Sequence, residues 1–263
     1  TICFISNSDL TIWPFNHTTW QLSMAPPNAE CRGDEVPGPS KIMASTIHED
    51  PEVTLFENFV SEEEVEHLLQ LCEGRWERSK VSKGAASDLH GRNSGAAEHP
   101  LGEERYGDTR TSSSVHLQWD ETIVTERIAA RVAAVTQTKL AQVEPLVMLR
   151  YEPGQFFKLH HDGSMRPSTV FVYLNGLEPG SGGETSFPHL GFQVRPAQHT
   201  AVMWHNRTAD GEGDMRLKHE AKPVLAGTKY GMNCFVNLVP QRDASNVVVY
   251  QQTEEGTPVK VEG

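Results

Sequence analysis

The stretch RYEPGQFFKLHHDG, residues 150–163, places two histidines and an aspartate directly after a run that is typical of a β-strand. Alternate residues of a strand point to the same face, so His160 and Asp162 are expected to project together while His161 points away. Two imidazoles and one carboxylate that leave other coordination positions open form the ligand set of non-haem Fe(II) oxygenases. The pattern therefore predicts a metal site that contains His160 and Asp162 and requires one further ligand.

The third ligand must come from elsewhere in the chain, and the downstream candidates are His189, His199, His205 and His219. Spacing alone does not choose between them. Context favours His219, which lies just before a strand-like segment and is followed ten residues later by Lys229. A 2-oxo acid that chelates iron would point its distal carboxylate into the pocket, where a lysine could neutralise it through a charge-assisted hydrogen bond. We therefore predict His219 as a ligand and Lys229 as the partner of that carboxylate.

Short strands must position these residues. From residue 146 onward the apolar period is two, in the runs LVMLRY, TVFVYLNG, GFQVRP, TAVMWHN and YGMNCFVNLV, which are separated by Pro and Gly turns. No helix of convincing length interrupts them. Many short strands without crossover helices favour an antiparallel sandwich or jelly roll. The expected fold class is mainly β with flanking helices (α+β).

Two helices are expected before these strands. In residues 59–74, Ser61 and Glu64 have the spacing of a capping box, and the apolar residues that follow recur at helical intervals. In residues 120–137, Asp120 can cap a second helix, whose valines and isoleucine form one apolar face. Both helices are expected to back one side of the β-structure.

The pattern along the chain predicts three parts. Residues 1–50 mix Pro, Gly and charged residues without either period and are predicted to be a flexible leader. Residues 51–240 are predicted to form the domain that carries the site, with its centre at 146–240, and residues 241–263 a tail. Within the domain, residues 83–108 are rich in glycine and small residues and predict a long loop, either a lid or a disordered segment.

Composition limits the possible functions. The formal net charge of −12 argues against nucleic acid and against an anionic lipid surface as partners. The four cysteines form no CxxC pair, so neither a structural zinc site nor a disulfide framework is expected. No stretch approaches 18 consecutive apolar residues, so no membrane span is expected in this chain.

Four motifs in order, YEPGQFFKLHHD, TVFVYLN, GGETSFP and HEAKPVLAGTK, resemble the prolyl 4-hydroxylase branch (alpha subunit catalytic domain) of the Fe(II)/2-oxoglutarate-dependent dioxygenases. The resemblance covers roughly residues 53–240. It implies a double-stranded β-helix, which is a distorted jelly roll, with iron bound by His160, Asp162 and His219. It also implies that Lys229 pairs with the distal carboxylate of 2-oxoglutarate.

Further site residues follow from the same resemblance. Tyr151 in YxxGQ and Thr185 in GGET match residues that bind the cosubstrate. Arg110 and Arg166 match arginines that would touch the peptide. The family often has Trp where this chain has Phe235, and Gly-Asp before the strand that here reads HTAVMW, so both positions bear on the substrate. No catalytic residue beyond the iron centre is implied.

The implied activity is hydroxylation of proline at C4 in a peptide or protein. It consumes O2, converts 2-oxoglutarate to succinate and is supported by ascorbate. The partner would be a proline-containing peptide or protein, and the sequence does not indicate an oligomeric state. The resemblance allows the cytoplasm and favours the secretory pathway (endoplasmic reticulum). Two sequons, at Asn16 and Asn206, would matter only in a secreted chain.

Two alternatives remain open. The same chemistry could act on a free amino acid or another small molecule. A non-catalytic metal-binding jelly-roll module is also possible, although such a module has no use for Lys229. A halogenase is disfavoured because Asp162 keeps the carboxylate that would have to be absent to open a halide position.

Overall fold

The computed structural model describes residues 37–82, 108–119 and 121–242, and outside these ranges only short strands. It contains α1 (Glu62–Leu71) and α2 (Ile123–Val135), and two 3₁₀ turns at Leu140–Gln142 and Met215–Leu217. The strands are β1 (Ile2–Cys3), β2 (Leu10–Asn16), β3 (Thr19–Met24), β4 (Lys41–Glu49), β5 (Glu52–Glu57), β6 (Glu77–Arg78), β7 (Val81–Ser82), β8 (Glu104–Arg105), β9 (Ser113–His116), β10 (Val147–Tyr151), β11 (Phe157–His160), β12 (Ser168–Tyr173), β13 (Thr185–Phe187), β14 (Phe192–Val194), β15 (Thr200–His205), β16 (His219–Ala221), β17 (Lys229–Val236), β18 (Val249–Gln252) and β19 (Pro258–Val261).

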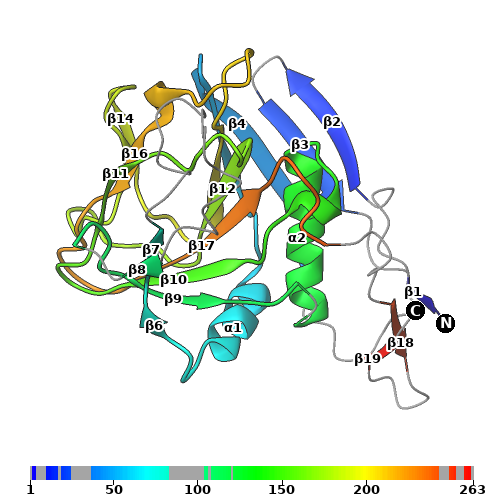
Figure 1. The fold of residues 1–263 in the computed structure, drawn as a ribbon. Coiled ribbons are helices and arrows are strands. Elements are labelled where there is room, and N and C mark those ends of the chain that lie inside the picture. The colour runs from blue at the N-terminus through cyan, green and yellow to red at the C-terminus, as the bar shows by residue number, and fades with distance from the viewer. Residues whose placement is uncertain are drawn as a thin grey trace, which may run out of the picture.

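Two antiparallel sheets form the body of the fold. The larger has the order β2-β3-β4-β5-β15-β12-β17-β10-β9-β6, and the smaller has the order β11-β16-β13-β14. Strands β1, β18 and β19 form a third small sheet, and β7 pairs with β8. In Figure 1 the strands of the smaller sheet lie on the left, and α1 and α2 lie on the other side of β10 and β17. This arrangement confirms the predicted double-stranded β-helix with flanking helices.

Strand alternation divides the buried side chains between two cores. On β12, Val170 and Val172 pack into the cluster that includes α1 and α2, whereas Phe171 and Tyr173 pack into the cluster that includes the smaller sheet. This β12 run is apolar on both faces because each face is covered, one by helices and one by strands. The space between the two sheets is therefore a separate, aromatic-rich core.

The helix starts are partly as predicted. The capping box of Ser61 and Glu64 is present at α1. At α2 the predicted cap was wrong: the N-cap is Thr122, whose hydroxyl accepts the backbone N–H of Thr125, and Asp120 lies outside the described residues. An N-cap side chain must reach the N–H group three residues later, which Thr122 does at this start. Within the described residues, no helix is long and apolar enough to cross a membrane.

The prediction of a flexible leader over residues 1–50 was wrong where strands β2, β3 and β4 join the larger sheet. Strand β4 pairs with β5, and Ile42 and Ala44 are buried in the helix-side core. Strand β4 contributes only Ile42 and Ala44 to this core, which is too weak a pattern to stand out beside the preceding Pro and Gly. The sheet therefore begins before residue 51, while the outer limits of the domain remain a prediction. Most of the predicted 83–108 loop lies outside the described residues.

Candidate metal and cosubstrate site

The predicted ligands are delivered by the smaller sheet. His160 ends β11 and His219 begins β16, and the two residues are direct cross-strand partners. Nε2 of His160 lies 3.6 Å from Oδ1 of Asp162, and Nε2 of His219 lies 3.7 Å from Oδ2 of the same residue. The ligand atoms of the three residues all lie within 4.8 Å of one another. This donor set and its spacing suit a single metal ion.

Asp162 reaches the cluster from a turn and not from a strand, which corrects the expectation drawn from alternation. Strand β11 ends at His160, and Gly163 has a φ of 93°, which a residue with a side chain rarely adopts. The backbone N–H of Gly163 donates to Nδ1 of His161, 3.0 Å away. This bond ties His161 to the turn, and His161 is not part of the ligand cluster.

Both histidines present the same nitrogen to the cluster. Nδ1 of His160 lies 2.9 Å from the carbonyl oxygen of Lys158, and Nδ1 of His219 lies 3.0 Å from that of Leu217. A carbonyl oxygen only accepts, so Nδ1 of each ring carries the proton and donates. Each Nε2 is therefore left with a lone pair that faces Asp162, as a metal ligand requires.

The electrostatics favour the metal-binding protonation states. Burial lowers the pKa of His219 to about 4, against the opposing effect of Asp162, so the ring is neutral near pH 7. Burial would raise the pKa of Asp162, but His219, His160 and the hydroxyl of Thr169 together hold it well below its usual range. The cluster thus offers a neutral imidazole at His219 and a carboxylate at Asp162.

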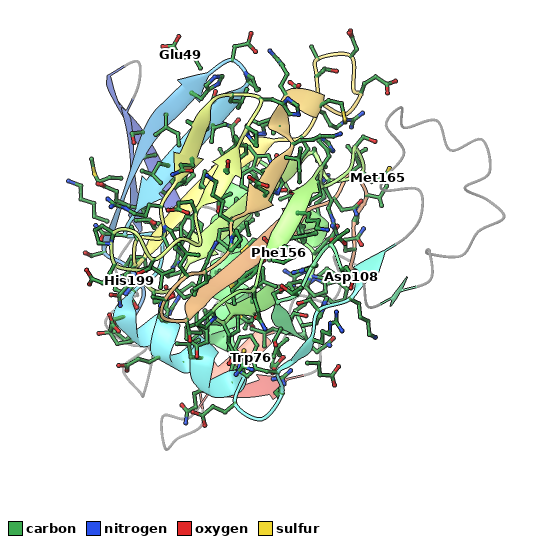
Figure 2. All side chains as sticks on the ribbon, turned by 90° about the vertical axis from the view of Figure 1, so that its left-hand side faces the viewer. Glu49, Trp76, Asp108, Phe156, Met165 and His199 are labelled. Atoms are coloured by element: carbon green, nitrogen blue, oxygen red, sulfur yellow. The ribbon has the colours of Figure 1, made fainter. Side chains whose placement is uncertain are left out.

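Aromatic rings hold the two imidazoles from the sides. Phe157 stacks on His160 with ring centroids 3.6 Å apart, and Trp204 meets His219 edge to face at 4.6 Å. Such contacts fix ring orientation and exclude water from the ligand atoms. Figure 2 turns the smaller sheet toward the viewer, with Phe156, the residue before β11, near the centre of the view.

A pocket between the sheets adjoins the cluster. It is lined by the three ligand residues and by Lys229, Tyr151 and Thr185, all predicted from the sequence. Sequence reasoning missed Asn233, which also lines the pocket and lies two residues from Gly231 on the inner face of β17. Its signal is the alternation Lys229, Gly231, Asn233, which places all three on one face of the strand.

Lys229 is a fully buried cation at the start of β17. Its Nζ donates to the carbonyl oxygen of Gly183, 2.7 Å away, and lies 4.9 Å from the ring centroid of Phe171. No carboxylate in the described ranges forms an ion pair with it, and burial lowers its pKa to about 7. An unpaired buried amine is unfavourable for the fold. An anionic group that binds at Lys229 would satisfy this amine, and its binding there remains a prediction.

Tyr151 and Thr185 complete the polar lining. The hydroxyl of Tyr173 donates to Oγ1 of Thr185, 2.7 Å away, which fixes the threonine on the pocket wall. Burial raises the pKa of Tyr151, and the neighbouring side chains of Arg110 and Ser112 oppose that rise. Both residues line the pocket, and their hydrogen bonds to a cosubstrate remain a prediction.

The residues predicted to touch the substrate lie outside this lining. The guanidinium of Arg110 lies 4.8 Å from the ring centroid of Phe157. Arg166 donates two hydrogen bonds to Glu144, of 2.9 and 2.7 Å, and stacks 3.9 Å from the ring centroid of Phe235. Arg166 and Phe235 therefore form one unit, held by Glu144. A substrate role for these residues remains a prediction.

The other histidine candidates lie away from the cluster. His189 is exposed in the turn between β13 and β14. Nε2 of His199 lies 3.1 Å from a carboxylate oxygen of Glu62, and exposed His205 hydrogen-bonds Ser168. The position of His219 in the cluster therefore supports the prediction that was made from its sequence context.

Comparisons with known proteins match the part of the chain that carries this site. Residues 146–237 match the family model of the 2OG-Fe(II) oxygenase superfamily. Prolyl 4-hydroxylase subunit alpha-2 of Caenorhabditis elegans is 29% identical over 210 residues, and the match covers 74% of this chain and 36% of that protein. Probable prolyl 4-hydroxylase 7 of Arabidopsis thaliana is 27% identical over 216 residues, and the match covers 72% of this chain and 63% of that protein. Prolyl 4-hydroxylase subunit alpha-1 of Homo sapiens is 29% identical over 213 residues, and the match covers 74% of this chain and 37% of that protein.

These matches span from about a third to under two thirds of the relatives' own lengths. Among solved structures, the viral collagen prolyl hydroxylase of Paramecium bursaria Chlorella virus-1, in its complex with 2-oxoglutarate, has the same fold. Its TM-score is 0.54 at 22% identity, and the match covers 71% of this chain and 96% of that one. Together the family match over residues 146–237 and the related sequences support a 2OG-Fe(II) oxygenase domain in this chain, which is similar to prolyl 4-hydroxylases.

Proposed function

We propose that this chain is the catalytic part of an Fe(II)/2-oxoglutarate-dependent dioxygenase that hydroxylates proline at C4 in a peptide or protein. The observation that carries the proposal is the presence of the His160, Asp162 and His219 cluster and the buried Lys229 in one pocket. A metal site and an unpaired buried cation side by side fit a ligand that chelates the metal at one end and is anionic at the other. The relatives are named as prolyl 4-hydroxylases, which supports proline as the residue modified.

The protein's own residues would act by binding and orientation. His160, Asp162 and His219 would hold Fe(II), which supplies oxidative chemistry together with O2 and 2-oxoglutarate. Lys229 would donate to the distal carboxylate of 2-oxoglutarate, with Tyr151 and Thr185 on the same wall. No side chain is required as a general acid or base, and ascorbate is expected to sustain turnover.

A non-catalytic metal-binding module explains this site less well. A structural metal needs its ligands and their hydrogen-bond partners, but it does not need a lysine buried beside them. The cost of burying Lys229 is unexplained unless an anion binds there. The alternative of a free amino acid or another small molecule as substrate concerns the substrate and leaves the chemistry unchanged.

The test is turnover with a panel of substrates. Protein loaded with Fe(II) under anaerobic conditions is mixed with 2-oxoglutarate, ascorbate, O2 and a library of proline-containing peptides, and both succinate and the mass gain of one oxygen atom are followed. His219→Ala is the test variant, and His189→Ala, at an exposed histidine outside the cluster, is its matched control.

Succinate coupled to an oxidised peptide, lost in His219→Ala and kept in His189→Ala, is the expected result. Succinate without a modified peptide would retain the dioxygenase and overturn the peptide substrate. No succinate from protein shown by metal analysis to hold iron would contradict the proposal.

A further inference from the structure

A chain of buried hydrogen bonds connects Asp162 to residues outside the ligand cluster. Oγ1 of Thr169 lies 2.7 Å from Oδ2 of Asp162, and Nδ2 of Asn206 lies 2.9 Å from Oγ1 of Thr169. Nε1 of Trp204 lies 2.9 Å from Oδ1 of Asn206. Thr169 and Asn206 are fully buried and Trp204 is nearly so, which shields these bonds from competing water.

The direction of every bond in this chain is determined. Indole nitrogen only donates, so the atom of Asn206 that faces Trp204 is the amide oxygen. The amide nitrogen then faces Thr169 and also donates to the carbonyl oxygen of Arg166, 2.9 Å away, which only accepts. Two independent partners thus fix the same amide orientation. Because Oγ1 of Thr169 accepts from Asn206, its single proton is free to be donated to Asp162.

Rigid elements hold these residues. Thr169 is a direct cross-strand partner of both Trp204 on β15 and Phe235 on β17, in the middle of the larger sheet. The backbone N–H of Asn206 donates to the carbonyl oxygen of Pro167, and its carbonyl oxygen accepts from the N–H of Asp214. Asp162, by contrast, lies in a turn after the end of β11. Its carboxylate therefore needs an external support to keep one orientation.

We infer that Thr169 and Asn206 are positioning residues for the metal site: Thr169 donates to Oδ2 of Asp162 and Asn206 sets the direction of that donation. The inference rests on the proposed function, because it takes Asp162 as a metal ligand. Neither residue lines the pocket, and neither was singled out as functional by its type or spacing. Asn206 belongs to a sequon, but its side-chain nitrogen is buried and engaged in two hydrogen bonds.

Binding of Co(II) to the full chain without cosubstrate tests this inference, with the d–d absorption of the bound ion as the readout. Thr169→Val keeps the shape of the side chain and removes the hydroxyl, Thr169→Ala removes it without adding bulk, and Thr169→Ser retains it. The matched control is Thr136→Val, which removes a buried threonine hydroxyl that donates to the carbonyl oxygen of Val132 in α2.

Thr169→Val and Thr169→Ala are expected to weaken Co(II) binding by about 10- to 100-fold. They should also alter the absorption spectrum of bound Co(II), whereas Thr169→Ser and Thr136→Val should match the wild type in both. If either hydroxyl-free variant binds Co(II) with wild-type affinity and spectrum, the positioning role is wrong while the metal site stands. If the wild type itself binds no Co(II), the proposed metal site fails, and the inference fails with it.

Discussion

His160 and His219 face each other across the β11–β16 pair, with ring centroids 4.3 Å apart. Strand register delivers both rings to one point, and each Nδ1 donates to a nearby backbone carbonyl. A slip of one residue in this pairing would turn one imidazole to the opposite face of the sheet. The two histidines are therefore placed by the sheet, and only Asp162 depends on a turn.

Lys229→Met should weaken 2-oxoglutarate binding while leaving metal binding intact. The substitution removes the buried ammonium but keeps a side chain of similar length in the pocket. A hydrogen bond to a charged group contributes about 1.5–3 kcal/mol, so the dissociation constant should rise by about 10- to 100-fold. Calorimetry on Mn(II)-loaded protein measures it, with the exposed Lys139→Met as control. Unchanged 2-oxoglutarate affinity in Lys229→Met would show that this lysine does not bind the cosubstrate.

The affinity for 2-oxoglutarate should depend on pH through the same lysine. Burial lowers the pKa of Lys229 to about 7 in the free chain, and the carboxylate needs the protonated amine. Binding should be tightest below pH 7 and should weaken by up to about tenfold per pH unit above it, because a proton must first be taken up. Titrations between about pH 6 and 9 measure this. A wild-type affinity that stays constant over this range would be inconsistent with the assignment.

The free energy of unfolding should depend on pH in the opposite direction to the 2-oxoglutarate affinity. Lysine in the unfolded chain has a pKa of about 10.4, so the unfolded state holds more protons at this position between about pH 7 and 10.4. The contribution of Lys229 to stability should therefore rise with pH across this window. Denaturant unfolding of the wild type and Lys229→Met should show it: the difference in stability favours the variant most at pH 7 and shrinks toward pH 10. A constant difference would indicate a lysine with an ordinary pKa.

Glu64 should be a major determinant of stability far from the site. Its carboxylate is fully buried, accepts from Arg131 and Arg127, and closes the capping box of α1. Glu64→Gln leaves two guanidinium groups facing a neutral amide and should cost about 3 kcal/mol. Glu63→Gln, at an exposed position in the same turn, should change stability by less than about 0.5 kcal/mol. Urea unfolding distinguishes the two, and equal values would refute the role of Glu64.

The sequence predicted much of the site because the motifs are local and ordered. His160 and Asp162 are two residues apart, and Lys229 opens the strand that its alternation indicated. The turn geometry of Asp162 was not predictable from alternation, since a strand and a strand followed by a glycine turn have similar patterns. Gly163, with its positive φ, is the one residue that marked the difference.

Contacts between distant segments were beyond the reach of local patterns. Thr169 and Asn206 resemble an ordinary strand threonine and a sequon asparagine, and only the pairing of β12 with β15 brings them together near Asp162. Strand β4 was missed for a similar reason, because its partner β5 and the core beneath it supply the stability that its own composition does not show. Tertiary context overrides propensity in both cases.

The most direct test of the proposed iron and 2-oxoglutarate site is an anaerobic titration of the Fe(II)-loaded protein with 2-oxoglutarate. It is followed by the charge-transfer absorption that arises when a 2-oxo acid chelates Fe(II). The expected band saturates at one 2-oxoglutarate per chain, is absent from His219→Ala and is unchanged in His189→Ala. Wild-type protein that demonstrably holds Fe(II) but develops no such band at any 2-oxoglutarate concentration would contradict it.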